Sequence, residues 1–135
     1  MLPLRINATM HECSSHQGYV IEGKGSTVYF AGDTGLFEGF RTIGDQFRID
    51  IALLPISAYS PPPFRKHHLS PEDALDALEF LRARAMVPIH WGTFRLSLEP
   101  MDEPPRKLTR LADDRGLEDR VFLLQPGERH QIGAR

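Results

Sequence analysis

Two side chains that bind metals or move protons follow buried strand-like runs in this sequence. Asp33 comes after Val-Tyr-Phe-Ala-Gly at 28–32, and His90 comes after Met-Val-Pro-Ile at 86–89. An acid at the end of a buried strand is costly to desolvate unless a positive or proton-donating group meets it. Singly, Asp33 could cap its own turn, and His90 could be a core histidine. Together they favour a metal or catalytic site, because α/β proteins gather their chemistry at strand ends.

Four further histidines lie in loops. His11 and His16 share the polar loop 11–16 with a cysteine and a glutamate, a possible metal-binding cluster whose spacing matches no zinc-finger pattern. His67 and His68 come just before a helix start, where the side chain of His68 can point into a cleft. The alternative interpretation is that all four are surface residues of loops with no functional role.

Strand and helix patterns place these residues. Alternation and β-branched or aromatic content predict strands at 4–9, 18–22, 27–31, 49–56 and 86–89, and a closing hairpin of 121–124 with 128–132. Apolar spacing predicts helices at 36–46, 71–84 and 105–115. The helix at 71–84 has the clearest start, with Ser70 as N-cap, Pro71 at the first position and two acids in the first turn.

Residues 57–66 contain three consecutive prolines and predict a loop with no regular element. Within it, Arg65 and Lys66 follow Phe64 and could present two cations to a phosphate or a carboxylate. A solvated loop is the other interpretation.

Composition sets the class of protein. The chain has 135 residues of uniform character, which predicts one domain. A net charge of −2 gives no electrostatic reason to expect nucleic acid or an anionic membrane as a partner. The single cysteine, Cys13, excludes an internal disulfide and fits a reducing compartment. No apolar run approaches the ~18 residues of a membrane span, and the N-terminus lacks a signal-peptide core, so a cytoplasmic protein is expected.

Five motifs, in this order, carry a resemblance: TVYFAGDTG, IDIALLPISAY, HHLSPEDAL, VPIHWGTF and LLQPGE. Together they resemble one branch of the metallo-β-lactamase superfamily, which includes lactonase-like metal-dependent hydrolases and the N-acyl-phosphatidylethanolamine-hydrolysing phospholipase D. The family fold is a four-layer αββα sandwich around a two-metal centre. The implied fold class here is α/β, a mixed β-sheet with covering helices, forming the C-terminal half of that sandwich.

The resemblance implies roles for individual residues. Asp33 matches the carboxylate that bridges the two metals, and His90 matches a ligand of the second metal. His11 matches the histidine of the first metal site, although His16 competes for that assignment. His68 resembles a catalytic histidine near the substrate pocket, and Tyr59 lies in the loop of that pocket.

The implied chemistry is metal-assisted hydrolysis. Two metals lower the pKa of a bridging water, and the resulting hydroxide attacks an ester, lactone or phosphodiester. Mixed histidine and aspartate ligands suit zinc, with manganese or iron as alternatives.

The family's leading H-x-H-x-D-H motif is absent, so residues 1–135 are expected to form a single partial domain with only part of the ligand set. An uncovered apolar face then predicts a homo-oligomer or association with a missing N-terminal half. The expected function is a hydrolase that is inactive unless completed. The alternatives are a non-catalytic remnant or protein-interaction module, and an aspartic protease, suggested by Asp33-Thr34-Gly35.

Overall fold

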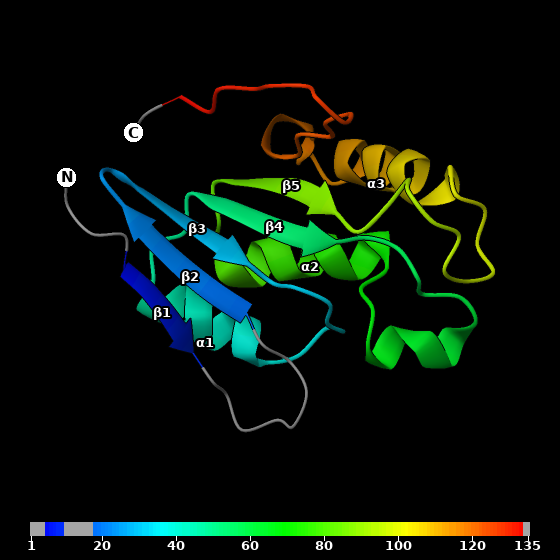
Figure 1. The fold of residues 1–135 in the computed structure, drawn as a ribbon, viewed down its shortest axis with the longest axis horizontal. Helices are drawn as coiled ribbons and strands as arrows, with labels where there is room; N and C mark the ends of the chain where they lie inside the picture. Colours follow the sequence, from blue (N-terminus) through cyan, green and yellow to red (C-terminus); the bar gives the residue numbers. More distant parts are fainter. Residues whose placement is uncertain (1–4, 10–17, 134–135) are drawn as a thin grey trace.

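A computed structural model describes residues 5–9 and 18–133 of the chain. One five-stranded sheet, in the order β1-β2-β3-β4-β5, forms the centre (Figure 1). Its strands are β1 (Arg5–Thr9), β2 (Gly18–Gly23), β3 (Ser26–Phe30), β4 (Ile51–Pro55) and β5 (Ala85–Ile89). The helices are α1 (Gly39–Gln46), α2 (Pro71–Leu81) and α3 (Glu103–Asp114), with short 3-10 helices η1 (Pro62–Lys66) and η2 (Glu118–Arg120).

The sheet is mixed, and its parallel part determines where chemistry can gather. Strands β1, β2 and β3 pair antiparallel, whereas β3, β4 and β5 pair parallel. The carboxyl ends of these last three strands therefore meet at one edge of the sheet. The α/β class expected from the sequence is confirmed.

Helices α1 and α2 cover one face of the sheet (Figure 1). On that face Tyr29 is 2% exposed, and its ring meets the ring of Phe40 edge-on at 6.2 Å. The two helices also approach each other closely, because a Cβ on Gly44 would lie only 2.5 Å from the carbonyl oxygen of Phe80. The following fully buried strand residues complete this side of the core: Val20, Ala52, Leu54 and Met86.

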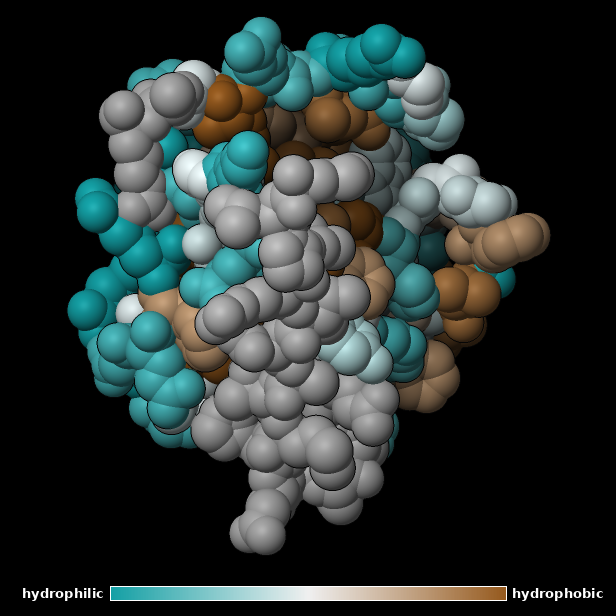
Figure 2. Space-filling view, turned by 60° about the vertical axis from the view of Figure 1, so that its left-hand side comes forward, coloured by the Kyte–Doolittle hydropathy of each residue, from teal (hydrophilic) through white to brown (hydrophobic). Residues whose placement is uncertain are grey.

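The opposite face of the sheet is apolar and half-buried. The strand register aligns Val28 with Ile51, and Leu53 with both Phe30 and Val87. All five side chains are of intermediate exposure. Because successive side chains of a strand point to opposite faces of the sheet, they lie on the face opposite to Tyr29 and Ala52. Figure 2 shows apolar residues reaching the surface near the top of the view and at its right edge, between hydrophilic ones.

Three predicted helix boundaries and one predicted loop were wrong. Helix α1 starts at Gly39 rather than at residue 36. Helix α2 ends at Leu81 rather than at Arg84, because Arg82 adopts the left-handed backbone conformation (φ 50°). Helix α3 starts at Glu103 rather than at residue 105, with its prolines in the first turn. The proline-rich stretch is not irregular throughout, since residues 62–66 form η1.

The predicted closing hairpin was also wrong. Val121 forms an isolated parallel bridge with Met86, and the N–H of Phe122 donates to the Met86 carbonyl at 2.9 Å. This segment therefore uses the open edge of β5 as its partner. Residues 122–133 contain no strand.

Candidate metal centre

Asp33, His68 and His90 meet at the carboxyl edge of the parallel strands. Asp33 lies three residues after β3, His90 directly follows β5, and His68 precedes α2. One ligand atom from each lies within 4.8 Å of the other two. Three residues from three separate segments therefore converge on a volume that suits a metal ion.

Asp33 is paired with His68. The Nδ1 atom of His68 lies 2.7 Å from Oδ1 of Asp33, and the side chains are 24% and 51% exposed, respectively. A carboxylate oxygen accepts a hydrogen bond from Nδ1–H, so Nε2 of a neutral His68 ring carries a lone pair. The aspartate is more exposed than its place after a buried strand suggested, and the imidazole is the proton-donating partner that the sequence required.

His90 is held in an unusual backbone conformation beside His68. The two imidazoles lie nearly parallel, with an angle of 9° and 6.0 Å between their centres. His90 has φ +60°, and its carbonyl accepts the hydroxyl of Ser57. The loop after β4 therefore helps to fix the start of the loop after β5.

The imidazole of His90 also carries a buried nitrogen that needs a partner. Its Nδ1 is buried and has no hydrogen bond within the part of the chain that the structure describes. Leaving such an atom unpaired is unfavourable, and coordination of a metal by a neutral imidazole satisfies it. Imidazole nitrogens and carboxylate oxygens, as offered by His90 and Asp33, are ligands that zinc accepts. The residues present therefore fit a metal ion.

Close packing holds the Asp33 turn against the end of η1. A Cβ on Gly35 would lie 2.3 Å from the Lys66 carbonyl oxygen and 2.8 Å from that of Arg65. The N–H of His68 then donates to the carbonyl of Phe64 at 3.0 Å, which turns the chain at the end of η1 toward Asp33. Glycine at position 35 is what permits the two segments to touch.

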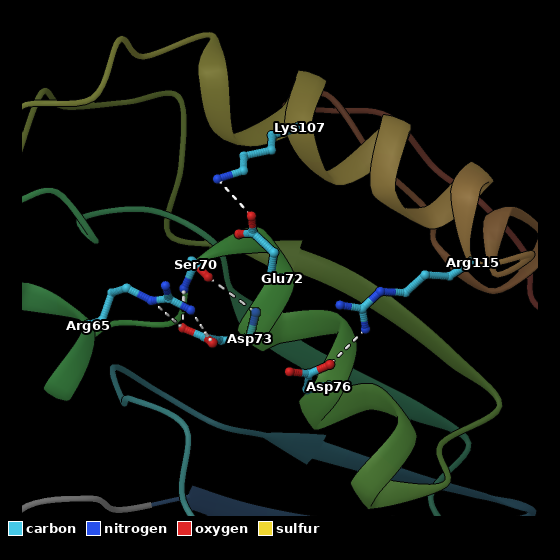
Figure 3. Close-up of polar contacts among 7 residues, drawn as sticks. All are labelled: Arg65, Ser70, Glu72, Asp73, Asp76, Lys107 and Arg115. Atoms are coloured by element: carbon cyan, nitrogen blue, oxygen red, sulfur yellow. Dashed lines mark hydrogen bonds and ion pairs between the residues drawn. The ribbon is translucent and has the colours of Figure 1, made fainter. Parts of the chain in front are cut away.

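A polar network at the start of α2 anchors η1 (Figure 3). Asp73 accepts two hydrogen bonds from Arg65, at 3.1 and 2.7 Å. Ser70 and Asp73 form a capping box, each accepting the other's backbone N–H at 3.2 Å. The guanidinium of Arg65 is thus paired with Asp73 instead of pointing to a ligand, which corrects the two-cation interpretation of this loop.

Asp73→Asn is expected to lower stability by about 1 kcal/mol at neutral pH, as for the loss of a helix cap. Burial alone would raise the pKa of Asp73, but hydrogen bonds from Arg65 and Ser70 outweigh it and hold the pKa below 3.8. Its contribution is therefore fully present above that pH and is lost as the pH falls further. Urea unfolding at a series of pH values checks this, and the two proteins should converge in acid. A constant difference at every pH would contradict it.

Two ion pairs attach α3 to α2 (Figure 3). Lys107 binds Glu72 at 2.8 Å, and Arg115 binds Asp76 at 2.7 Å. Nearby, the hydroxyl of Tyr59 donates to Glu103 at 2.5 Å. Burial, together with that carboxylate, raises the pKa of Tyr59 far above its usual range.

Not all candidate ligands can be placed. His11 and His16 lie outside the described residues, so the first-site histidine stays a prediction. Two residues that support the site had no signal in the sequence: Ser57, which binds the His90 carbonyl, and Glu99, which binds backbone amides of the loop after β4.

Comparison with known proteins gives the family. The model of the β-lactamase superfamily domain matches residues 2–91, which contain Asp33, His68 and His90. This chain belongs to the metallo-β-lactamase superfamily. A UPF0173 metal-dependent hydrolase of Methanopyrus kandleri is 33% identical over 114 residues, covering 84% of this chain and 45% of the relative. An N-acyl-phosphatidylethanolamine-hydrolyzing phospholipase D of Caenorhabditis elegans is 39% identical over 111 residues, covering 78% of this chain and 31% of that protein.

A solved structure agrees with this superfamily assignment. Igni18, a metallo hydrolase from Ignicoccus hospitalis, superposes with a TM-score of 0.67 at 30% identity, over 93% of this chain and 50% of that one. The chain thus spans about half the length, or less, of the superfamily members it matches here. Among the described residues, no helix is long and apolar enough to cross a membrane.

Proposed function

We propose that this chain is the C-terminal part of a metal-dependent hydrolase, with Asp33 and His90 as metal ligands. The observation that carries the proposal is the convergence of Asp33, His68 and His90 within 4.8 Å, together with the buried, unpaired Nδ1 of His90. His11 is proposed as a further ligand from the preceding loop. Zinc is the proposed metal because it accepts both imidazole and carboxylate, although manganese and iron bind the same atoms.

The proposed reaction is hydrolysis of an ester, lactone or phosphodiester in a small molecule. The metal, when bound, supplies an activated water and polarises the scissile group. His68 is proposed to act on the substrate. With its Nδ1–H donating a hydrogen bond to Asp33, its Nε2 is positioned to accept or return a proton. The second oxygen of Asp33 remains for the metal.

The half-buried apolar sheet face supports a partial domain. Val28, Phe30, Ile51, Leu53 and Val87 present this surface, and the metallo-hydrolase relatives are about twice as long as the aligned region. We propose that the missing N-terminal half, or a second copy of the chain, covers it. A non-catalytic remnant or interaction module is the alternative. The aspartic protease alternative rests on the Asp33-Thr34-Gly35 motif alone. Among the described residues Asp33 faces two imidazoles rather than a second carboxylate.

The test is metal per chain by elemental analysis, on protein of defined oligomeric mass. Near-stoichiometric zinc is expected if self-association completes the site, and hydrolysis of ester, lactone and phosphodiester substrates should then follow. Metal near zero in folded protein would make this chain a half-site. In that case the measurement is repeated after adding the N-terminal half, and continued absence of metal would favour the non-catalytic remnant.

His68→Ala separates the proposed catalytic role of His68 from a role as ligand. The expected result is unchanged metal content with activity reduced about 100-fold or more, the range of general acid–base catalysis. Metal content and turnover are measured on the same preparation. Loss of metal together with activity would place His68 among the ligands instead.

A further inference from the structure

Glu99 is a buried carboxylate that holds the loop after β4. It is 6% exposed and lies between β5 and α3 in the chain. Its Oε1 accepts the N–H of Ala58 at 2.6 Å, and its Oε2 accepts the N–H of Ser60 at 3.0 Å. Both oxygens of one carboxylate thus bind amides on either side of Tyr59.

The environment of Glu99 favours its charged form. Burial alone would raise the pKa of Glu99. Hydrogen bonds from Ser97 and from backbone amides, those of Ala58 and Ser60 included, outweigh burial and lower that pKa. The carboxylate is therefore ionised at neutral pH, when hydrogen bonds from N–H groups to it are strongest.

The loop that Glu99 binds has a backbone that needs support. Ala58 has φ +68°, the left-handed conformation that is unfavourable for a residue with a Cβ. A second contact ties the same segments, since the N–H of Leu98 donates to the carbonyl of Ser60 at 3.2 Å. The shape of the loop after β4 therefore depends on the segment that contains Glu99.

This loop reaches the candidate metal centre through Ser57. The hydroxyl of Ser57, the residue before Ala58, donates to the carbonyl of His90, which is itself left-handed at φ +60°. The N–H of Ile56 donates to Ile89 at 3.2 Å and keeps the two strand ends in register. The left-handed conformations of Ala58 and His90 are thus linked through the side chain of Ser57. The Glu99 carboxylate holds the Ala58 end of this link.

We propose that Glu99 is a positioning residue that sets the orientation of the His90 imidazole through Ala58 and Ser57. Glu99 makes no contact with the ligand atoms in the described structure, so its effect passes through the loop. The inference rests on the proposed function, in which His90 binds the metal. Groups that orient a ligand in this way change metal affinity by about 10–100-fold when removed.

The test compares Glu99→Gln with Asp50→Asn. Glutamine keeps the size of Glu99 but replaces one acceptor oxygen by an NH₂ group, which cannot accept an N–H. Asp50 is a matched control: it is also 6% exposed and accepts the N–H of Thr27 at 2.8 Å, but at the amino end of β4, away from the site. Each variant is measured in the full chain.

The first readout needs no metal: the chemical shifts of the His90 imidazole nitrogens, by NMR. We expect them to change in Glu99→Gln and not in Asp50→Asn. The second readout is cobalt(II) affinity by visible absorption, expected to fall about 10–100-fold in Glu99→Gln only. If the unmodified chain binds no cobalt(II) even after the N-terminal half is added, the proposed metal function fails, while the imidazole shifts still test the positioning role.

Ala58→Gly added to Glu99→Gln should move the His90 shifts back toward those of the unmodified chain, because glycine adopts positive φ readily. If Glu99→Gln does not fold, Ser57→Ala interrupts the same connection without touching the carboxylate, and the His90 shifts should change in it. Unchanged shifts in a folded Glu99→Gln or in Ser57→Ala would overturn the proposal. Equal changes in Glu99→Gln and Asp50→Asn would overturn it as well.

Discussion

Asp33→Ala and His90→Gly are each expected to lower metal affinity by more than about 100-fold in the completed protein, because even groups outside the ligand shell change affinity by 10–100-fold. Asp33→Ala removes the carboxylate that faces both imidazoles. His90→Gly removes the ring whose Nδ1 is buried with no hydrogen-bond partner among the described residues. Glycine is chosen at position 90 because it keeps the left-handed backbone. Elemental analysis and cobalt(II) titration measure the effect.

The fold should survive both substitutions. The Asp33 side chain is 51% exposed, and His90 is only partly buried, so neither substitution removes a fully buried side chain from the core. His67→Ala serves as the control, since it removes the neighbouring histidine of the same motif and should leave metal content unchanged. Unaltered metal in either test variant would remove that residue from the site. Unfolding of the variant, seen by circular dichroism, would leave His90→Asn as the variant to use.

Gly35→Ala is the second large effect, and it acts on both stability and metal binding. The new Cβ would lie 2.3 and 2.6 Å from the oxygen and carbon of the Lys66 carbonyl, which are backbone atoms that cannot rotate away. The Asp33 turn and the end of η1 must therefore separate. Overpacking of this kind costs about 1–3 kcal/mol. Because the same contact brings His68 to Asp33, metal affinity should fall with it.

Gly23→Ala is the matched control, because the nearest atom to its Cβ would be 3.9 Å away. Urea unfolding and cobalt(II) titration are run on both variants. A Gly35→Ala protein that loses stability but keeps its affinity would show that the contact supports the fold without shaping the site. If both quantities match the unmodified chain, the close approach itself is wrong.

The position of Asp33 and His90 after two predicted strands was sufficient to predict that they lie at the same edge of the sheet. Both follow strands whose parallel pairing is typical of α/β patterns, and parallel strands end at one edge. The place of His68 followed from the N-cap at Ser70, because a well-marked helix start locates the residue just before it. Their separation of at most 4.8 Å was not predictable from spacing.

Other features depend on contacts that no local pattern reveals. Glu99 begins an acidic, proline-rich stretch whose sequence predicts only a loop, yet its carboxylate is buried against backbone amides about 40 positions earlier. The Pro-Gly turn near residue 126 suggested a hairpin, but the edge of β5 bound Val121 and Phe122 instead. In both cases tertiary hydrogen bonding overrode the local signal.

Three interactions that shape the candidate centre join positions far apart in the chain: 35 residues for Asp33 with His68, 33 for Ser57 with His90, and 41 for Ala58 with Glu99. Forming such contacts costs loop-closure entropy, and this cost is offset only after the parallel strands have paired. The centre should therefore form late in folding. A nascent chain that has not yet emerged beyond Glu99 already holds Asp33, His68 and His90 but lacks the carboxylate that stabilises the loop linking them.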